Sequence, residues 1–345
     1  MRSAVRSGAM GCRSSVPHPV MRSVVFPAQL LRSSCSRSVV TQWKDAVMES
    51  ARAIKQVVRD AENQEWVHDL TNKMEENVVE AYDQLGEVQW PIRNVLHGSF
   101  MGHPLHATVT DVPTGAWTTA FVLDAADVLF DQKQLAPGAD AAIAVGLAGA
   151  SVASASGWAD WKHTKGSTQR TGLIHGLLNG AATGFYLTSF ILRKTGLRGP
   201  GQILSTVGFG LTIAGSYLGG ELVFDRLVGV NRAEPSEEPA EFTPIASVDD
   251  LEEGKPYRFE VNQVPVVVVK SNGTFYALSD ICAHLGRPLS GGEVHDGCIT
   301  CPAHDSTFKL ENGAVVTGPA AYSQPTFDTR VNDGYLEIRS RHVAD

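Results

Sequence analysis

Three long segments of this chain contain no Asp, Glu, Lys or Arg: residues 141–159, 171–192 and 199–220. A fourth segment, residues 104–123, is interrupted only by Asp111. About 20 apolar residues suffice for a helix to cross a bilayer, and the Gly, Ala, Ser and Thr that fill these segments let membrane helices approach one another closely. The pattern favours a transmembrane bundle of four α-helices. A buried soluble bundle of similar composition is the competing interpretation.

The residues before this bundle fall into two parts. Residues 1–44 contain six arginines and no acidic residue, which is typical of an organellar transit peptide, although a start codon assigned too early would also explain such a segment. In residues 45–96 the apolar side chains recur every three or four positions among many charges, which predicts one or two amphipathic helices. We expect their apolar stripe to pack against the next elements of the protein rather than against a partner or a membrane surface.

The pattern changes after the helices. Residues 231–241 are rich in Pro and Glu and are predicted to form an extended, solvated linker. Residues 242–345 contain short alternating runs separated by Asn-Gly and Asp-Gly turn signals. These turn signals begin at Asn272, Asp296, Asn312 and Asp333. The predicted fold class is therefore an α-helical transmembrane bundle, over residues 97–230, followed by a small antiparallel all-β domain.

Two short loops of the β segment carry the most distinctive side chains. Cys282 and His284 are separated by one residue, and Cys301 and His304 by two. Two thiolates suit one iron of a 2Fe-2S cluster and two imidazoles suit the other, an arrangement that raises the reduction potential above that of a cluster with four cysteines. A zinc site of two Cys and two His is the alternative, but the one-residue spacing is unlike the usual zinc pairings. Cys298 lies in an apolar strand pattern and is interpreted as a packed cysteine rather than a ligand.

These loops resemble the Rieske 2Fe-2S family in CAHLGRPL (residues 282–289), in CPAHDSTF (residues 301–308) and in the later GPA (residues 318–320), and the whole resemblance covers about residues 242–339. It implies a Rieske-type 2Fe-2S cluster as the cofactor. The implied metal ligands are Cys282, His284, Cys301 and His304, with Ser306 as a further cofactor-binding residue. Gly286 is expected to permit an unusual backbone turn, and the GPA segment to cover the cluster.

The segment departs from the Rieske proteins of bc-type complexes at several positions. Arg287 and Ala303 stand where those proteins have two additional cysteines, so the bracing disulfide is absent. Ser306 matches the family's hydroxyl donor to a bridging sulfur, whereas Phe308 stands where those proteins have a second donor, a tyrosine. Hydrogen bonds to the sulfurs stabilise the reduced, more negative cluster. We therefore expect a reduction potential between those of the ferredoxin-like and bc-type groups.

Residues 97–230 resemble a family of bacterial four-helix membrane proteins of unknown function that are sometimes joined to a Rieske domain. The resemblance lies in GHPLHATVTDVPTGAWTTAFVLDAAD, SGWADW, IHGLLN and GGELVF. With four spans, several ionisable residues near helix ends share a membrane face with the β domain: His103, His106, the segment 160–163, His175, Glu221 and Asp225. One hypothesis is that these residues form a quinone pocket, bind a haem through two of the histidines, or make up a proton path. The other hypothesis is that they are interfacial residues at helix ends that contact lipid headgroups and loop backbone.

The net charge of -8 offers no basic surface for nucleic acid, which we exclude as a partner. The leading hypothesis is a membrane-anchored Rieske-type electron-transfer protein whose partners are redox donor and acceptor proteins or quinone, together with membrane lipid. A quinol-oxidising or haem-containing subunit of a membrane oxidoreductase is an alternative, as is a redox sensor.

An oxygenase is improbable, because only about forty residues follow His304 and they leave no room for a separate catalytic iron domain. An electron carrier or an oxidoreductase subunit is therefore favoured over a self-contained enzyme, and no residue is assigned a catalytic role. The expected location is a multi-pass position in the bacterial cell membrane, or in the mitochondrial inner membrane if residues 1–44 are a transit peptide.

Overall fold

The computed structural model describes residues 48–49, 52–84 and 89–341, so the predicted targeting segment, residues 1–44, lies outside the described residues. Residues 52–62 are helical, and α2 (Glu65–Asp83) and α3 (Gln89–His97) follow. The prediction of amphipathic helices is confirmed for this part of the chain. Val67 of α2 is fully buried in a cluster with Trp161 and Leu173, so the apolar stripe of α2 packs against the protein's own helices.

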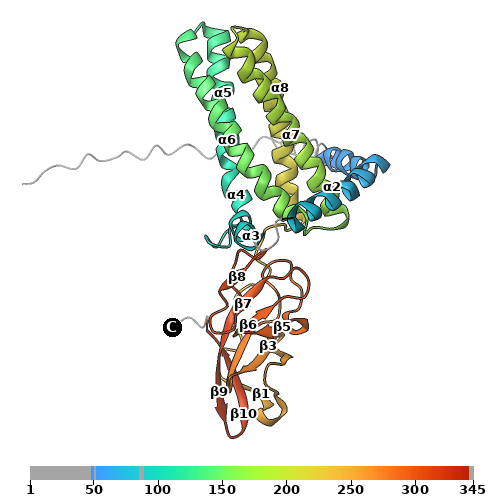
Figure 1. Cartoon of the computed structure of the whole chain (residues 1–345), viewed down its shortest axis with the longest axis vertical. Coiled ribbons are helices and arrows are strands. Elements are labelled where there is room, and N and C mark those ends of the chain that lie inside the picture. Colours follow the sequence, from blue (N-terminus) through green and yellow to red (C-terminus); the bar gives the residue numbers. More distant parts are fainter. Residues whose placement is uncertain (1–47, 50–51, 85–88, 342–345) are drawn as a thin grey trace, which may run out of the picture. The chain divides into compact units, whose positions relative to one another are not determined.

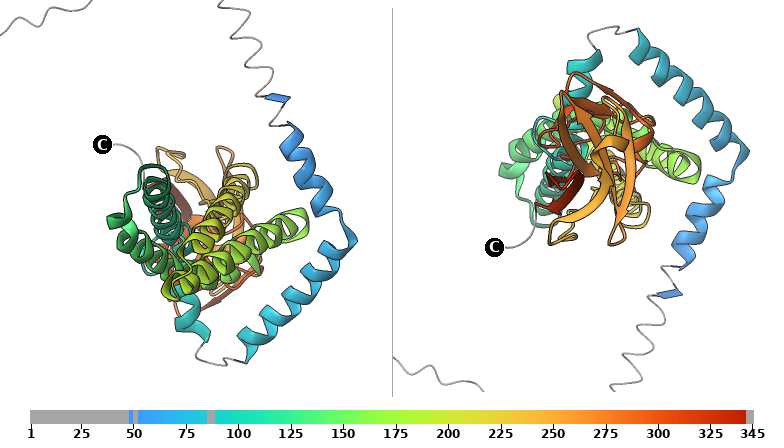
Figure 2. Two further views of the ribbon diagram at one scale, coloured as in Figure 1. Left: turned by 90° about the horizontal axis from the view of Figure 1, so that it is seen from above. Right: turned by 90° about the horizontal axis from the view of Figure 1, so that it is seen from below.

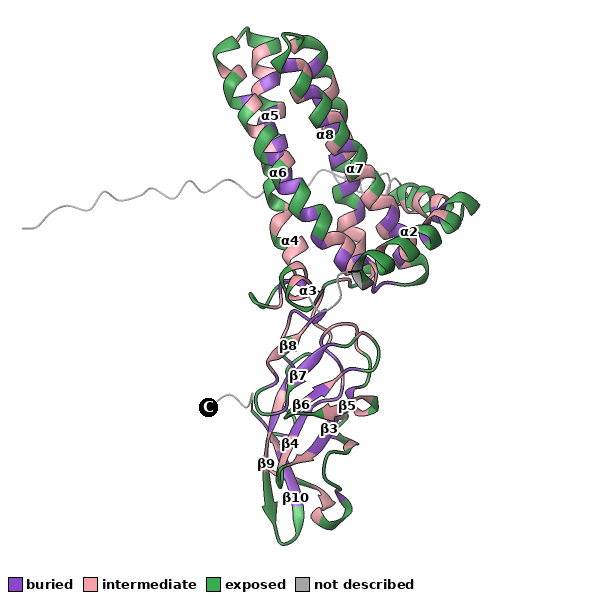
Figure 3. Cartoon of the chain, viewed as in Figure 1, coloured by how far each residue is buried: buried purple, intermediate pink, exposed green. Residues whose placement is uncertain are grey.

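Four long helices follow the short helix α4 (Leu105–Val109). They are α5 (Asp111–Phe130), α6 (Ala136–Trp161), α7 (Gly166–Lys194) and α8 (Arg198–Gly220). Helix α5 packs along α6 and α7 along α8, and the two pairs meet where α6 contacts α7 and α5 contacts α8 (Figures 1 and 2). Buried positions are scattered along these helices between many exposed ones (Figure 3). Where the pairs meet, Trp117 stacks on Tyr186 with ring centroids 4.1 Å apart.

The predicted membrane spans are only partly reproduced. The first, residues 104–123, is divided, because Asp111 and Pro113 favour a new helix start and α5 therefore begins at Asp111. Among the described residues, two helical stretches are long and apolar enough to cross a membrane, Lys133–Trp161 and Arg198–Asp225. Helices α5 and α7 are also long, but neither is among these two stretches. Two of the four predicted spans thus meet this test.

A buried ion-pair network joins the ends of α5 and α7 to the starts of α6 and α8. The side chain of Arg193 is fully buried and donates to both carboxylate oxygens of Asp124 and, at 3.4 Å, to Asp140. Arg198 donates to Asp140 at 2.9 Å and to Asp124 at 3.3 Å. The charges compensate one another where water is scarce, which ties the four helix ends together.

The C-terminal part contains two antiparallel sheets, with strand orders β1-β10-β9-β4-β3-β2 and β5-β6-β7-β8. The strands are β1 (Thr243–Ser247), β2 (Pro256–Val261), β3 (Val264–Ser271), β4 (Thr274–Ser279), β5 (Glu293–His295), β6 (Cys298–Thr300), β7 (Thr307–Lys309), β8 (Val315–Thr317), β9 (Thr326–Asn332) and β10 (Tyr335–Ser340). The predicted small antiparallel all-β domain is confirmed.

The predicted turns are confirmed as well. Asn272, Asp296 and Asp333 have positive φ and are each followed by a glycine with positive φ, which is the backbone of a two-residue hairpin turn. Asn312 lies between β7 and β8, where Gly313 has positive φ and its N–H donates to the carbonyl of Lys309 at 2.9 Å. Asn-Gly and Asp-Gly pairs therefore set the register of this domain.

The predicted linker, residues 231–241, contains neither helix nor strand, yet it is tied to the β domain. Ala233 is 1% exposed and belongs to the hydrophobic cluster that includes Cys282 and Cys301. The N–H of Arg232 donates to the carbonyl of Ala283 at 3.1 Å, and the N–H of Ser340 donates to the carbonyl of Pro239 at 2.8 Å. The expectation of a solvated segment therefore does not hold for Ala233 and Pro239, which are buried, whereas most of the other residues of the segment are exposed.

Candidate metal centre

The two cysteine-histidine loops have the same backbone construction. The first follows β4 and the second joins β6 to β7. The N–H of Cys282 donates to the carbonyl five residues later, and its own carbonyl accepts from Gly286, four residues later, at 2.8 Å. Cys301 makes the same two bonds five and four residues ahead, the second from Asp305 at 3.1 Å. Gly286 and Asp305 both have positive φ, 74° and 62°, so the unusual turn expected at Gly286 is confirmed and recurs in the second loop.

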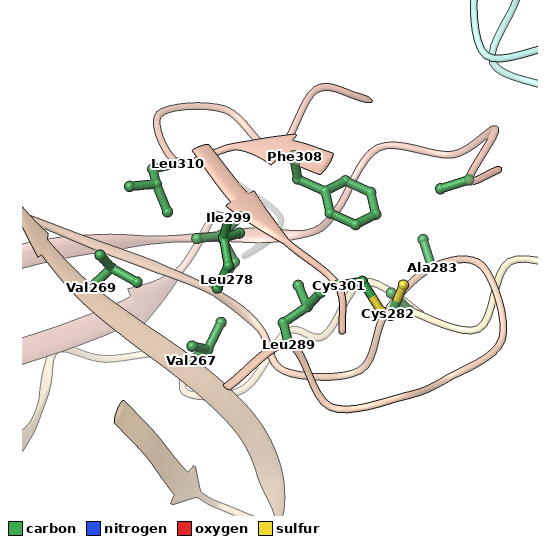
Figure 4. Close-up of a cluster of buried hydrophobic side chains, with 12 residues drawn as sticks. Val267, Val269, Leu278, Cys282, Ala283, Leu289, Ile299, Cys301, Phe308 and Leu310 are labelled. Carbon is green, nitrogen blue, oxygen red and sulfur yellow. The ribbon is translucent and has the colours of Figure 1, made fainter. Parts of the chain in front are cut away.

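The two thiols meet in the interior. Cys282 is 1% exposed and Cys301 is 2% exposed, and both pack with Phe308 and Leu289 in the larger hydrophobic cluster of the domain. Figure 4 shows their sulfur atoms side by side. The thiol of Cys282 is hydrogen-bonded to the sulfur of Cys301, which lowers the pKa of Cys301 to about 7 and, together with burial, raises that of Cys282. A shared cation would remove both protons and favour two thiolates.

The two imidazoles also lie together. The rings of His284 and His304 are nearly perpendicular, with centroids 5.0 Å apart. Burial, with smaller contributions from His304, His97 and Arg93, lowers the pKa of His284 to about 3, and burial also lowers the pKa of His304. Both rings are therefore neutral near pH 7, which is the form that binds a metal.

Neighbouring polar groups hold the loops in place. The hydroxyl oxygen of Ser306 is fully buried and accepts a hydrogen bond from the N–H of Ala320 at 3.0 Å. Its own O–H is thus left to point at another acceptor. The side chain of Gln324 is 2% exposed; its amide donates to the carbonyls of Ser279 and Ile281, and its oxygen accepts from the N–H of Ala283 at 3.0 Å. Gln324 therefore fixes the first loop from both sides.

Comparison with known families finds matches for two segments of the chain. Residues 241–328 match the Rieske 2Fe-2S domain, and residues 102–232 match the family described as "Predicted membrane protein (DUF2231)". The anthranilate 1,2-dioxygenase ferredoxin subunit of Burkholderia cepacia is 30% identical over 99 residues, which are 29% of this chain and 92% of that protein. The chain belongs to the Rieske family. Its C-terminal domain carries a Rieske-type 2Fe-2S cluster and serves electron transfer.

Two further similarities concern the same Rieske domain. The cytochrome bc1 complex Rieske iron-sulfur subunit of Streptomyces lividans is 48% identical over 63 residues, 18% of this chain and 37% of that protein. The solved ferredoxin of carbazole 1,9a-dioxygenase from Nocardioides aromaticivorans IC177 is 27% identical, with 29% of this chain and 98% of that chain covered and a TM-score of 0.28.

The donor set of the Rieske domain fits a cluster of two irons. The thiols form one pair and the imidazoles another, as two irons with two protein ligands each require. Within the described parts of the chain, no group of three or more His, Cys, Asp or Glu side chains is placed to hold a single metal ion. The match of residues 241–328 to the Rieske 2Fe-2S domain favours the 2Fe-2S cluster over the alternative of one tetrahedral zinc.

The remaining predicted residues are accounted for as follows. Cys298 lies in β6, where its sulfur contacts the carbonyl of Asp296 at 3.7 Å, and Phe308 is fully buried beside the two cysteines. The GPA segment contacts Ser306 through the N–H of Ala320, and its covering role stays a prediction. His103 packs against Tyr322 of the Rieske domain, with ring centroids 6.2 Å apart.

Several residues of the helical part contact the cluster loops. The ring of His163 lies 5.4 Å from that of His284 and 5.3 Å from that of His304, between centroids. Arg93 donates to the carbonyl of His304 at 2.6 Å, and Asn94 accepts from the N–H of Gly318 at 2.8 Å. The sequence singled out His163 through its position at a helix end, but Arg93 and Asn94 were missed. Nothing in a segment more than 200 residues away signals such a contact.

His163 lies next to a second buried imidazole, that of His97. Its side chain is buried, and its ring lies 5.4 Å from that of His97, whose Nδ1 is 2.7 Å from a carboxylate oxygen of Asp160. Burial, together with neighbouring positive groups, lowers the pKa of His163, so its ring is neutral. The Nε2 atoms of His163 and His97 have no hydrogen-bond partner among the residues that the structure describes. The rings of His284 and His304 are thus covered by the neutral ring of His163, with Arg93 and Asp160 nearby.

Proposed function

We propose that the chain is a membrane-anchored Rieske electron-transfer protein in which Cys282 and Cys301 bind one iron and His284 and His304 bind the other. The observation that carries the proposal is the sorting of the donors: the two sulfurs meet in the domain interior, and the two imidazoles meet beside the helical part. When bound, a Rieske cluster supplies reversible one-electron chemistry.

The surrounding residues prepare this site in different ways. The apolar walls around Cys282 and Cys301 keep water from the sulfurs, which protects the cluster from hydrolysis. The backbone N–H of Ala320 occupies one lone pair of Ser306, which supports donation of the Ser306 hydroxyl to a bridging sulfur. Phe308 offers no such donor. With one of the two side-chain donors, a potential between the ferredoxin-like and bc-type groups is expected.

Membrane anchoring rests on two findings. Residues 102–232 match a family of predicted membrane proteins, and the stretches Lys133–Trp161 and Arg198–Asp225 are long and apolar enough to span a bilayer. Exposed apolar side chains on these helices, among them Val145, Ile203 and Ile213, would face lipid. A multi-pass arrangement would place the Rieske domain at one membrane surface. Extraction of membranes with alkaline carbonate tests this, because an integral protein stays in the pellet.

The partners are proposed to be redox donors and acceptors. The relatives include a dioxygenase ferredoxin subunit and a Rieske iron-sulfur subunit of a cytochrome bc1 complex, and each name describes one subunit of a larger redox system. A subunit of a membrane oxidoreductase is a second candidate, because the ligand histidines pack against His163 of the helical part. Quinol-dependent reduction of the oxidised cluster would separate this candidate from simple electron carriage.

Electron paramagnetic resonance of the reduced protein, with iron and acid-labile sulfide analysis, tests the ligand assignment. Two irons and two sulfides per chain with a Rieske-type spectrum are expected. Cys282→Ser and Cys301→Ser should lose the cluster. Cys298→Ser is the matched control, because it changes the third cysteine of the domain and should keep full cluster content. Zinc without sulfide in the purified protein would refute the assignment.

A further inference from the structure

We propose that His106 and His175 are the two axial ligands of a non-covalently bound, b-type haem in the helical part of the chain. This inference goes beyond the Rieske cluster and uses none of its ligands. It starts from the way in which the two imidazoles are held.

Each of these histidines is bound through one nitrogen to a backbone carbonyl of another helix. Nδ1 of His106, on α4, lies 2.8 Å from the carbonyl oxygen of Ala153 on α6. Nδ1 of His175, on α7, lies 2.9 Å from the carbonyl oxygen of Gly215 on α8. A carbonyl can only accept, so Nδ1 carries the proton in both rings and Nε2 keeps its lone pair. Histidines that bind metals characteristically donate their other ring N–H in this way.

The same local construction occurs where α4 meets α6 and where α7 meets α8. Four residues after the accepting carbonyl, α6 has Gly157 and α8 has Gly219. A Cβ at Gly157 would lie 2.9 Å from the ring of His106, and one at Gly219 would lie 3.3 Å from the ring of His175. Each ring is therefore seated in a groove that a larger residue would narrow. Two equivalent histidine sites, one between α4 and α6 and one between α7 and α8, indicate a ligand bound by both rings rather than two unrelated helix contacts.

The separation of the rings fits a shared metal. Their centroids are 6.2 Å apart and their planes cross at 81°. With each nitrogen about 2 Å from one metal, two imidazoles on opposite sides of it have centroids roughly 6 Å apart. The amide nitrogen of Asn179 lies 3.4 Å from both nitrogens of His175, which places it over the ring face rather than at the Nε2 lone pair. It also donates to the carbonyl of His175 at 2.9 Å.

The number of donors favours haem over a bare ion. Within the described ranges, no third His, Cys, Asp or Glu joins this pair. A free divalent ion usually needs three or four protein donors, whereas a porphyrin supplies four nitrogens and leaves two axial positions. Helical bundles commonly build such cofactor sites from side chains of facing helices. The sequence contains no Cys-x-x-Cys-His motif, so covalent attachment of the c type is excluded.

The test uses the full-length chain, purified in detergent from cells supplied with a haem precursor. We expect a Soret band, about one haem per chain by the pyridine haemochrome assay, and a low-spin ferric spectrum with two imidazole ligands. His106→Ala and His175→Ala should each abolish the low-spin spectrum. His68→Ala, an exposed histidine of α2, is the matched control and should retain it. Protein isolated without haem is titrated with haemin, and the same spectrum should develop.

A second variant guards against loss of folding. In His175→Gly, free imidazole should enter the vacated position and restore the low-spin spectrum, which a misfolded protein could not do. The proposal is overturned if wild-type protein neither contains nor takes up haemin, if both alanine variants keep the low-spin spectrum, or if the pair holds a metal without porphyrin. Acid-labile sulfide measured in the same samples reports the Rieske cluster separately, so either assignment can fail while the other stands.

Discussion

The imidazole of His163 stands perpendicular to that of His284, with ring centroids 5.4 Å apart and an interplanar angle of 90°. His163 belongs to the turn after α6, and His284 to the first cluster loop, so the contact joins the helical part to the Rieske domain. If His284 and His304 bind an iron as proposed, the exposed edges of their imidazoles are polar surface close to that iron. What covers this edge controls how closely water approaches the cluster.

His163→Ala should raise the reduction potential of the cluster. Removal of the ring admits water to the ligand imidazoles, and water stabilises the reduced, more negative cluster, by an amount expected to be on the order of tens of millivolts. A redox titration followed by circular dichroism measures the shift. His163→Phe keeps an aromatic cover and should leave the potential near the wild-type value. Equal potentials in the alanine variant and the wild type would show that the contact does not control the cluster.

The potential should also respond to the two side chains at the donor positions. Ser306→Ala removes a hydroxyl that accepts a hydrogen bond from Ala320 and whose own O–H can donate to a bridging sulfur. Loss of this donor should lower the reduction potential. Phe308→Tyr adds a hydroxyl beside the cysteines and should raise it, again by tens of millivolts at most. Both variants should keep full iron and sulfide content. A shift in the same direction for both would contradict the assignment of these positions.

The left-handed residues of the two loops give a paired stability test. Gly286→Ala places a Cβ on a backbone with φ of 74°, which costs about 1 kcal/mol, although the nearest atom to that Cβ is 3.7 Å away. Asp305→Gly relieves the same conformation and should be neutral or slightly stabilising. The temperature at which the visible circular dichroism of the cluster is lost should fall in the first variant only. A fall in both would show that the aspartate side chain has a separate role.

The sequence predicted the two cluster loops, the hairpin turns and the helical segments because these depend on local residue types. The Asn-Gly and Asp-Gly pairs dictate their own backbone, and the helices follow from apolar periodicity. The break at Asp111 was missed, since an uncharged run conceals a helix start. The hydrogen bonds of Asn94 and Arg93 to the second half of the chain were also missed, because no local pattern encodes a contact made at that distance in sequence.

The attachment of residues 231–241 was misjudged for a different reason. Pro and Glu in this segment lower its ability to form a core of its own, and that part of the argument stands. Ala233, however, fills a place in a core formed by other residues, beside Cys282. Composition describes what a segment can do alone, and it does not describe the surface on which the segment lies.

Removing one partner of the ion pair between Asp124 and Arg193 should destabilise the helical part more than removing both. Asp124→Asn leaves a buried guanidinium that is only partly compensated, and should destabilise the helices by about 3 to 5 kcal/mol. The double variant Asp124→Leu, Arg193→Leu removes both charges and should recover much of this loss. Thermal unfolding in detergent, followed by far-ultraviolet circular dichroism, measures the difference. If the destabilisation of the double variant equals the sum of the two single-variant effects, the two side chains act independently.

The stabilisation that Asp328 gives to the Rieske domain should be lost in acid. Burial favours a higher pKa, but hydrogen bonds from Arg341 and Arg339 outweigh it and hold the pKa of Asp328 below its usual value. The stabilisation is therefore complete above the ordinary aspartate pKa and is lost as the pH falls below it. Since the side chain is 35% exposed, we expect only about 0.5 to 1 kcal/mol. The melting temperatures of wild type and Asp328→Asn should differ at pH 7 and converge in acid; a constant difference would refute this.

The burial of Ala233 leaves little slack between the two halves of the chain. Helical structure ends at Asp225, and Ala233 is already part of the Rieske core, so only residues 226–232 connect them. A tether this short keeps the cluster loops at an effective concentration in the millimolar range or above relative to the helical surface. Contacts too weak to associate two separate proteins are then sufficient to keep His284 and His304 beside His163. A soluble partner that competes for the cluster loops would therefore need an affinity high enough to displace the tethered helical part.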